Sequence, residues 1–164
     1  MGYSNGNKLK VGSYNFFDAI NKNTNFKLVA LADTNLKTYR HLKRKHKVSV
    51  YLSYIELLKN HEVDLIVISS DDKSHFRILN NVLKFKPKFV LVEKPLAKKS
   101  AEIKKIVDLY RKSSVPLVVN FSRRFSKFYN DLKNEINTTK FGKIINIDIR
   151  YSRGFFHNAI HFID

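Results

Sequence analysis

Short apolar runs alternate with longer amphipathic stretches along most of the chain. The runs predict strands, which we place at 26–32, 48–51, 64–69, 89–93 and 115–120. The last three show no polar alternation, which indicates strands that are buried on both faces of a sheet. The stretches between the runs have helical spacing and predict helices at 36–46, 53–58, 74–85 and 100–112. This alternation indicates βαβ units with right-handed crossovers and a parallel sheet.

The pattern changes near residue 123. It predicts an amphipathic helix at 128–136, a turn at Gly142, a half-exposed strand at 144–151 and the start of a helix at 157–164. At the other end, Met1 is followed at once by a Gly-rich turn, Gly2 to Lys8. A doubly wound sheet needs a central first strand before such a turn. We therefore expect this sheet to lack most of its first strand.

The strand at 89–93 ends abruptly in Glu93, Lys94 and Pro95. Pro95 cannot continue a hydrogen-bonded ladder, so the strand stops at Lys94. Ligands of open α/β sheets bind outside the carboxyl ends of the strands. One carboxylate and one amine are thus expected where a ligand would lie, although an isolated Glu-Lys-Pro is more simply a surface ion pair beside a turn.

Composition narrows the classes of function. The net charge of +17, from 31 Lys and Arg against 14 Asp and Glu, suggests nucleic-acid binding as a hypothesis. However, the Lys residues are scattered, and a solvated helix face explains the cluster at 43–47. The absence of cysteine excludes disulfides and thiolate sites. With no apolar run of about 18 residues and no signal peptide, we expect a cytoplasmic protein without membrane contact.

Six segments, taken in order, resemble the Gfo/Idh/MocA family of NAD(P)-dependent sugar and inositol dehydrogenases. Val92-Glu93-Lys94-Pro95-Leu96 is similar to the family's Glu-Lys-Pro signature, and the residues from Ser70 to His75 to its Thr-Pro-Asn-x-x-His loop. The other four segments are 28–33, 120–125, 141–144 and 157–164, the last of which resembles the catalytic helix. The implied fold is a Rossmann-like domain over 1–122, with 123–164 as the beginning of a second, α+β domain.

The resemblance also implies roles for residues. Lys94 would orient the substrate hydroxyl and the cofactor ribose, and His161 would take the proton. Asp33 would bind the adenosine ribose and favour NAD, with NADP left open and a plain helix N-cap as the alternative. The other expected cofactor contacts are Gly2, Ser4, Asn5, Ser70, Asp71, His75 and Glu93, and the expected substrate contacts are Arg123, His157 and Asn158. His157 and His161 lie one helical turn apart, but no third ligand indicates a metal.

These expectations add up to an NAD(P)-dependent oxidoreductase of the sugar, sugar-nucleotide or inositol type. Because a first strand and a substrate domain are not evident in the sequence, we expect a truncated chain with little or no activity alone. The alternative is a non-catalytic binding or partner subunit, associating with itself or with a full-length homologue. Nucleic-acid binding through the net positive charge is a third and weaker hypothesis.

Overall fold

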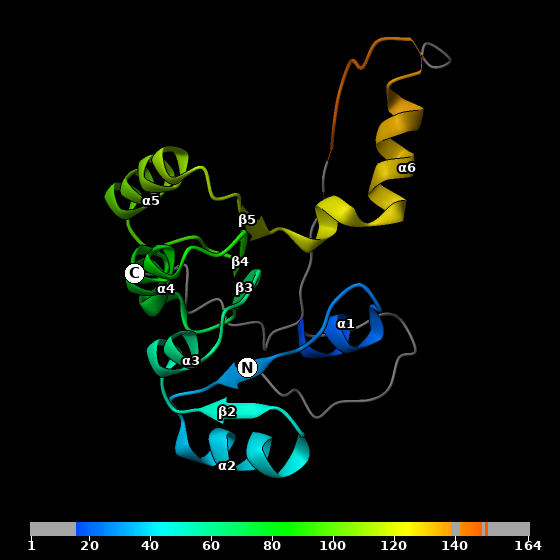
Figure 1. Ribbon diagram of the computed structural model, residues 1–164. Helices are drawn as coiled ribbons and strands as arrows, with labels where there is room; N and C mark the ends of the chain where they lie inside the picture. The colour runs from blue at the N-terminus through cyan, green and yellow to red at the C-terminus, as the bar shows by residue number, and fades with distance from the viewer. Residues whose placement is uncertain (1–15, 139–141, 149, 151–164) are drawn as a thin grey trace. The chain divides into compact units, whose positions relative to one another are not determined.

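A computed structural model describes residues 16–138, 142–148 and 150 (Figure 1). The chain divides into two compact units, Met1–Phe121 and Ser122–Asp164. Each unit is described by itself below.

The first unit alternates helices and strands, as the apolar pattern predicts. Its elements in chain order are α1 (Phe16–Lys22), β1 (Ala30–Ala32), α2 (Leu36–Lys45), β2 (Ser49–Tyr51), α3 (Tyr54–Asn60), β3 (Leu65–Ile68), α4 (Asp72–Val82), the 3₁₀ turn η1 (Leu83–Phe85), β4 (Phe89–Glu93), α5 (Ser100–Ser113) and β5 (Leu117–Asn120). The α/β class is therefore confirmed. The sequence analysis did not predict α1.

All described strands pair in parallel. β1 pairs with β2, and β3, β4 and β5 form a second piece in that order, so every neighbour is reached through a helix. The two pieces share no strand pairing within the described residues. In a doubly wound sheet the first strand lies between the second and the fourth, which here correspond to β1 and β3. Among the described residues, the sheet is thus divided where that central strand would be.

The core fills one face of the β3–β5 sheet. Register places Ile66, Val90 and Leu117 in one row across it, and the next row is Ile68, Val92 and Val119. These rows pack against α3, α4 and α5, which lie on the same side of the strands in Figure 1. The side chains of these helices that complete the core are Leu58, Ile78, Leu79, Val82, Ile106 and Tyr110.

The expectation that these strands are buried on both faces is wrong. Val67, Leu91 and Val118 form the row on the opposite face and are only partly buried, and β4 alternates between partly and fully buried positions. The reason is that the helices contributing to the core cluster all cover the other face. Full burial of one face and partial burial of the other, as seen for the described residues, are enough to favour apolar side chains throughout such short strands.

Several element boundaries also differ from the prediction. β1 covers only Ala30–Ala32 instead of 26–32, because its partner β2 offers three residues for pairing. Ser53 precedes α3 but makes no side-chain cap hydrogen bond. Asn35 caps α2 instead, since its Oδ1 accepts the amides of Lys37 at 2.9 Å and Thr38 at 3.1 Å.

The second unit contains η2 (Ser122–Phe125) and α6 (Lys127–Ile136), none of whose residues is buried. Residues 144–148 form no strand, and Ile145 is 98% exposed. The predicted strand is therefore wrong over these residues, because no described strand of this unit pairs with them. The helix expected at 157–164 lies outside the described residues. No described helix has the length and apolar character needed to cross a membrane.

Replacing Leu79 by alanine tests the core assignment. Leu79 is fully buried between the sheet and α5, so the cavity should lower the free energy of unfolding by about 2–5 kcal/mol. Urea denaturation measures this loss. Leu52→Ala is the control, because Leu52 is 42% exposed; an equal loss in both variants would contradict the core described here.

Tyr110 provides a pH-dependent test. Its hydroxyl donates to the Leu79 carbonyl at 3.0 Å, and burial raises the pKa of Tyr110 above its usual value. Tyr110→Phe should cost about 1 kcal/mol at pH 8. A raised pKa gives stability that is complete below the unfolded pKa of about 10 and is lost as the pH rises further. The difference between wild type and variant should therefore shrink at pH 11, whereas exposed Tyr129→Phe should show little effect at either pH.

Candidate functional site

Polar residues gather at the carboxyl edge of the three-stranded sheet. Ser70 and Asp71 follow β3, Glu93 ends β4, and Asn120 ends β5. Because the strands are parallel, their carboxyl ends meet at one edge, and Glu93 is the register partner of Asn120. This edge is where ligands of open α/β sheets bind.

Neighbouring groups fix the carboxylate of Glu93. Its Oε1 accepts a hydrogen bond of 2.7 Å from the side-chain amide of Asn120, and its Oε2 accepts the backbone amide of Lys94 at 3.2 Å. The Lys94 ammonium is exposed and makes no ion pair with any described residue. The alternative of a Glu93–Lys94 surface ion pair is thus not what the structure contains, and the amine stays available to a ligand.

His75 connects the loops that follow β3 and β4. It lies in the first half of α4 and is 1% exposed. Its Nδ1 is 2.7 Å from the carbonyl oxygen of Pro95, and its Nε2 is 3.2 Å from the carbonyl oxygen of Ser70. Both ring nitrogens therefore face backbone of the loops. The structure thus places the ring between the two loops, where it can position them, and the expected contact of His75 with a cofactor stays a prediction.

Ser74 holds the turn at the start of α4. Its Oγ lies 2.8 Å from Asp71 Oδ1 and 2.9 Å from Ser70 Oγ. The hydrogen bond that Ser74 donates holds the pKa of Asp71 below its usual value, against the opposing effect of partial burial. Ser70 and Asp71 are both exposed. The structure thus presents a hydroxyl and an ionised carboxylate from the β3 loop at the sheet edge.

Asp33 lies at the carboxyl end of β1 and shapes the turn into α2. Its Oδ1 accepts the amide of Asn35 at 2.8 Å, and Asn35 in turn caps the helix. One carboxylate oxygen of Asp33 thus has a structural task. The alternative that Asp33 is the N-cap residue of the following helix is wrong, since Asn35 is the N-cap residue of α2.

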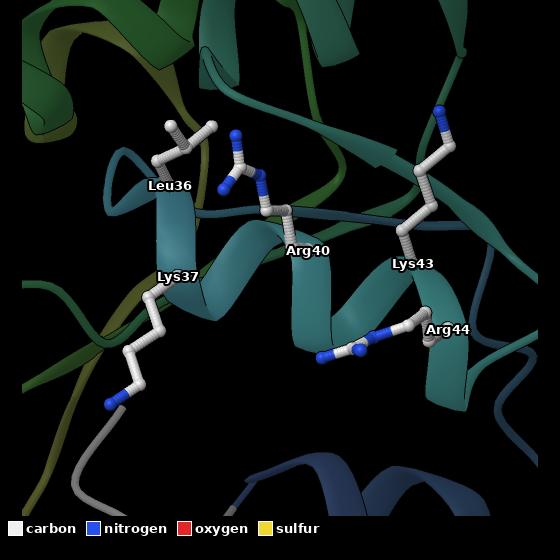
Figure 2. A pocket seen from close by; sticks show the side chains of 5 residues that line it. All are labelled: Leu36, Lys37, Arg40, Lys43 and Arg44. Carbon is white, nitrogen blue, oxygen red and sulfur yellow. The ribbon is translucent and has the colours of Figure 1, made fainter.

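An open pocket of about 730 Å³ lies along α2, directly after this turn (Figure 2). The side chains that line it are Leu36, Lys37, Arg40, Lys43 and Arg44. No carboxylate is among them. The pocket is therefore strongly cationic.

Comparison with known proteins identifies the family of the domain that carries this sheet edge. Residues 9–121 match the family model of Gfo/Idh/MocA oxidoreductases, described as an oxidoreductase family with an NAD-binding Rossmann fold. The chain belongs to the Gfo/Idh/MocA family. The family match includes β1 to β5 and their loops, so the carboxyl edge of this sheet is the NAD-binding edge of that fold.

Individual relatives agree with the family assignment. The chain is 29% identical over 117 residues to myo-inositol 2-dehydrogenase of Thermotoga maritima, covering 71% of this chain and 35% of that protein. Inositol 2-dehydrogenase of Salmonella typhimurium is 28% identical over 102 residues, covering 62% and 30%. The crystal structure of a probable dehydrogenase from Thermotoga maritima superposes with a TM-score of 0.68 at 26% identity, covering 73% and 36%. The chain thus spans about a third of the length of these Gfo/Idh/MocA relatives.

Several expected site residues lie outside the described residues. Gly2, Ser4 and Asn5 also precede the family match, which begins at residue 9. His157, Asn158 and His161 follow its end, so the pairing of Lys94 with His161 stays a prediction. Arg123 lies in η2 of the second unit. No group of three residues able to hold a metal ion occurs among the described residues.

Two features were not among the site residues expected from the sequence. Asn120 belongs to the family-like segment 120–125 and ends β5 as Glu93 ends β4. The shared edge of parallel strands is the signal that points to it. The sequence analysis explains the cationic cluster of α2 as a solvated helix face. The structure adds that cationic side chains of this helix line an open pocket.

Replacing His75 by phenylalanine tests its positioning role. Phenylalanine removes the hydrogen bond that the ring N–H donates to one of the two carbonyls and the polar contact at the other, so the free energy of unfolding should fall by about 1–3 kcal/mol. Hydrogen exchange should accelerate at Leu96 and Ala97 and around Ser70, while the amides within β4 stay protected. His61→Phe is the control, since it removes only a bond of 2.9 Å to Tyr51. Unchanged exchange in both loops of the His75 variant would contradict the role.

Proposed function

We propose that this chain binds a nicotinamide dinucleotide across the carboxyl ends of β1 and β3 to β5, as part of a dehydrogenase that acts on a polyol or sugar. The observation that carries the proposal is the loop at Glu93-Lys94-Pro95. Its carboxylate is held by Asn120 and its backbone by His75, while the Lys94 ammonium is exposed. An exposed, unpaired amine on a loop whose backbone is held at a ligand-binding edge fits a role in binding.

The described side chains fit the hydrogen-bonding groups of a dinucleotide. Asp33 keeps one carboxylate oxygen that can accept from a ribose hydroxyl, and the Lys94 ammonium can donate to another. The Ser70 hydroxyl lies on the loop between them in chain order. The nicotinamide supplies the hydride acceptor when bound. The protein's part at Lys94 is to hold the oxygen of the alcohol as negative charge develops on it.

The substrate class is proposed from the relatives. Two of them are named inositol dehydrogenases, which act on a secondary alcohol of a cyclic polyol. By the family resemblance, we assign the proton-accepting role to His161 and substrate contacts to Arg123, His157 and Asn158. A cytoplasmic location and a homo-oligomer complete the proposal, as expected from the sequence and the family.

A second candidate is a binding subunit without catalysis. The observation that favours it is α6, whose apolar side chains Phe128, Tyr129, Leu132 and Ile136 are 44–69% exposed. Such a helix face suits association with a homologous chain. In this reading the dinucleotide edge is a scaffold, and removing the Lys94 amine would not change the association.

Fluorescence titration of the 164-residue chain with NADH or NADPH tests the proposal. We expect saturable binding, and about tenfold weaker binding for Lys94→Ala, which corresponds to the loss of one charge-assisted contact. Lys98→Ala is the matched control, because it removes the same charge from the same exposed loop. Turnover of inositols should be absent or very slow, since the chain spans 35% of the Thermotoga maritima enzyme. Failure of both dinucleotides to bind would refute the proposed function.

A further inference from the structure

Asn120 links the ends of two neighbouring strands through its side chain. Its Nδ2 donates a hydrogen bond of 2.7 Å to Glu93 Oε1, and both residues are partly buried. The two residues are register partners that end β4 and β5, and they continue the row of Leu91 and Val118 on one face of the sheet. Strand register thus brings the amide to the carboxylate, so the contact does not depend on the conformation of a loop.

The acceptor distinguishes this bond from those of other asparagine side chains. Asn60 and Asn80 donate to backbone carbonyl oxygens four residues earlier in their own helices. Such local bonds are common for asparagine and carry no information about a site. Asn120 instead reaches a carboxylate on another strand, and its short distance is that of a charge-assisted hydrogen bond.

Both oxygens of the Glu93 carboxylate have uncharged donors. Oε1 accepts from Asn120, and Oε2 accepts from the backbone amide of Lys94 at 3.2 Å. The first bond is the shorter of the two and is partly buried, whereas the second is exposed, so Asn120 contributes more to holding the carboxylate. The Lys94 ammonium is exposed and has no ion pair with a described residue.

The Asn120 amide and the Lys94 ammonium are competing partners for this carboxylate. A hydrogen bond to a charged group stabilises more than an exposed ion pair does, so the amide prevails while it is present. Exposed lysines of this protein do pair where a carboxylate is within reach, as Lys88 does with Asp64 at 2.7 Å. Without Asn120, the ammonium next in the chain to Glu93 would be free to take its place.

We propose that Asn120 is a positioning residue for Lys94, because it holds the Glu93 carboxylate away from the ammonium and leaves the amine free for an oxygen of the ligand. The role requires no contact between Asn120 and the ligand. The inference rests on the proposed function for the identity of that ligand, a dinucleotide or the alcohol. The state of the amine itself is measurable without any ligand.

Acylation of the 164-residue chain by acetic anhydride, followed by peptide mass spectrometry, tests the state of the amine. Only the neutral amine is nucleophilic and an ion pair favours the charged form, so pairing slows the reaction. Asn120→Ala should slow acylation of Lys94 relative to Lys98 by about threefold, the effect of a weak exposed ion pair. Asn120→Leu, which keeps the side-chain volume, should act likewise. In about 1 M NaCl the slowing should disappear, because salt screens exposed pairs.

Glu93→Gln separates this role from a general structural one. In that background no carboxylate is present to pair with Lys94, so adding Asn120→Ala should change neither the acylation rate nor the affinity for NADH or NADPH. With Glu93 intact, Asn120→Ala should weaken dinucleotide binding by about threefold. Asn81→Ala is the matched control, because it removes a side-chain bond of 3.1 Å to the Tyr54 hydroxyl that links α4 to α3.

The outcomes separate the inference from the proposed function. Acylation of Lys94 that does not slow in either Asn120 variant would overturn the inference, as would equal slowing with and without the Glu93 carboxylate. Slowing in Asn81→Ala, or unchanged dinucleotide affinity despite slowed acylation, would also overturn it while the function stands. Slowing that requires Glu93, in a chain that binds neither NADH nor NADPH, would support the positioning of the amine and refute the proposed function.

Discussion

The buried imidazole of His75 is the contact on which the arrangement of this sheet edge depends. A histidine with 1% exposure is costly unless its ring N–H is paired. Here both ring nitrogens lie within hydrogen-bond distance of backbone carbonyls, and a neutral ring donates to one of them. One belongs to the loop after β3 and the other to the loop after β4. Neither loop has regular pairing of its own at that point. The ring therefore converts two separate strand ends into one surface, and the cis peptide bond at Lys94–Pro95 lies within it.

Asn120 adds a second link across the same edge, from β5 to β4. It binds Glu93 through the side chain, while the strand register already places the two residues opposite each other. As a result, the loops that follow β3, β4 and β5 present their polar groups together. Lys94 lies between Glu93, which Asn120 contacts, and Pro95, which His75 contacts. The network thus fixes the neighbours of Lys94, while the lysine side chain itself stays exposed.

The sequence predicted the alternation of elements because each strand is short, apolar and followed by polar turn residues, as at Ile68 and Val92. It also identified the Glu93-Lys94-Pro95 loop. The sequence-based prediction overestimated the burial of the strands. An apolar residue such as Leu91 is expected at its position whether one face or both faces of the sheet are covered. The sequence predicted a strand at 144–151, since alternation is visible in the sequence whereas a pairing partner is not. The buried role of His75 could not be predicted either, because it depends on two carbonyls from distant loops.

The division of the parallel sheet has a consequence for how the unit melts. The β3–β5 piece shares the large core with α3, α4 and α5, whereas the β1–β2 piece contributes none of its side chains to that cluster. Within the described part of the chain, the segment that carries Asp33 and α2 thus contributes fewer side chains to a buried cluster, so it should open locally before the rest. A ligand that bridges the two pieces would then act as a structural cross-link, and part of its binding energy would appear as increased cooperativity of unfolding.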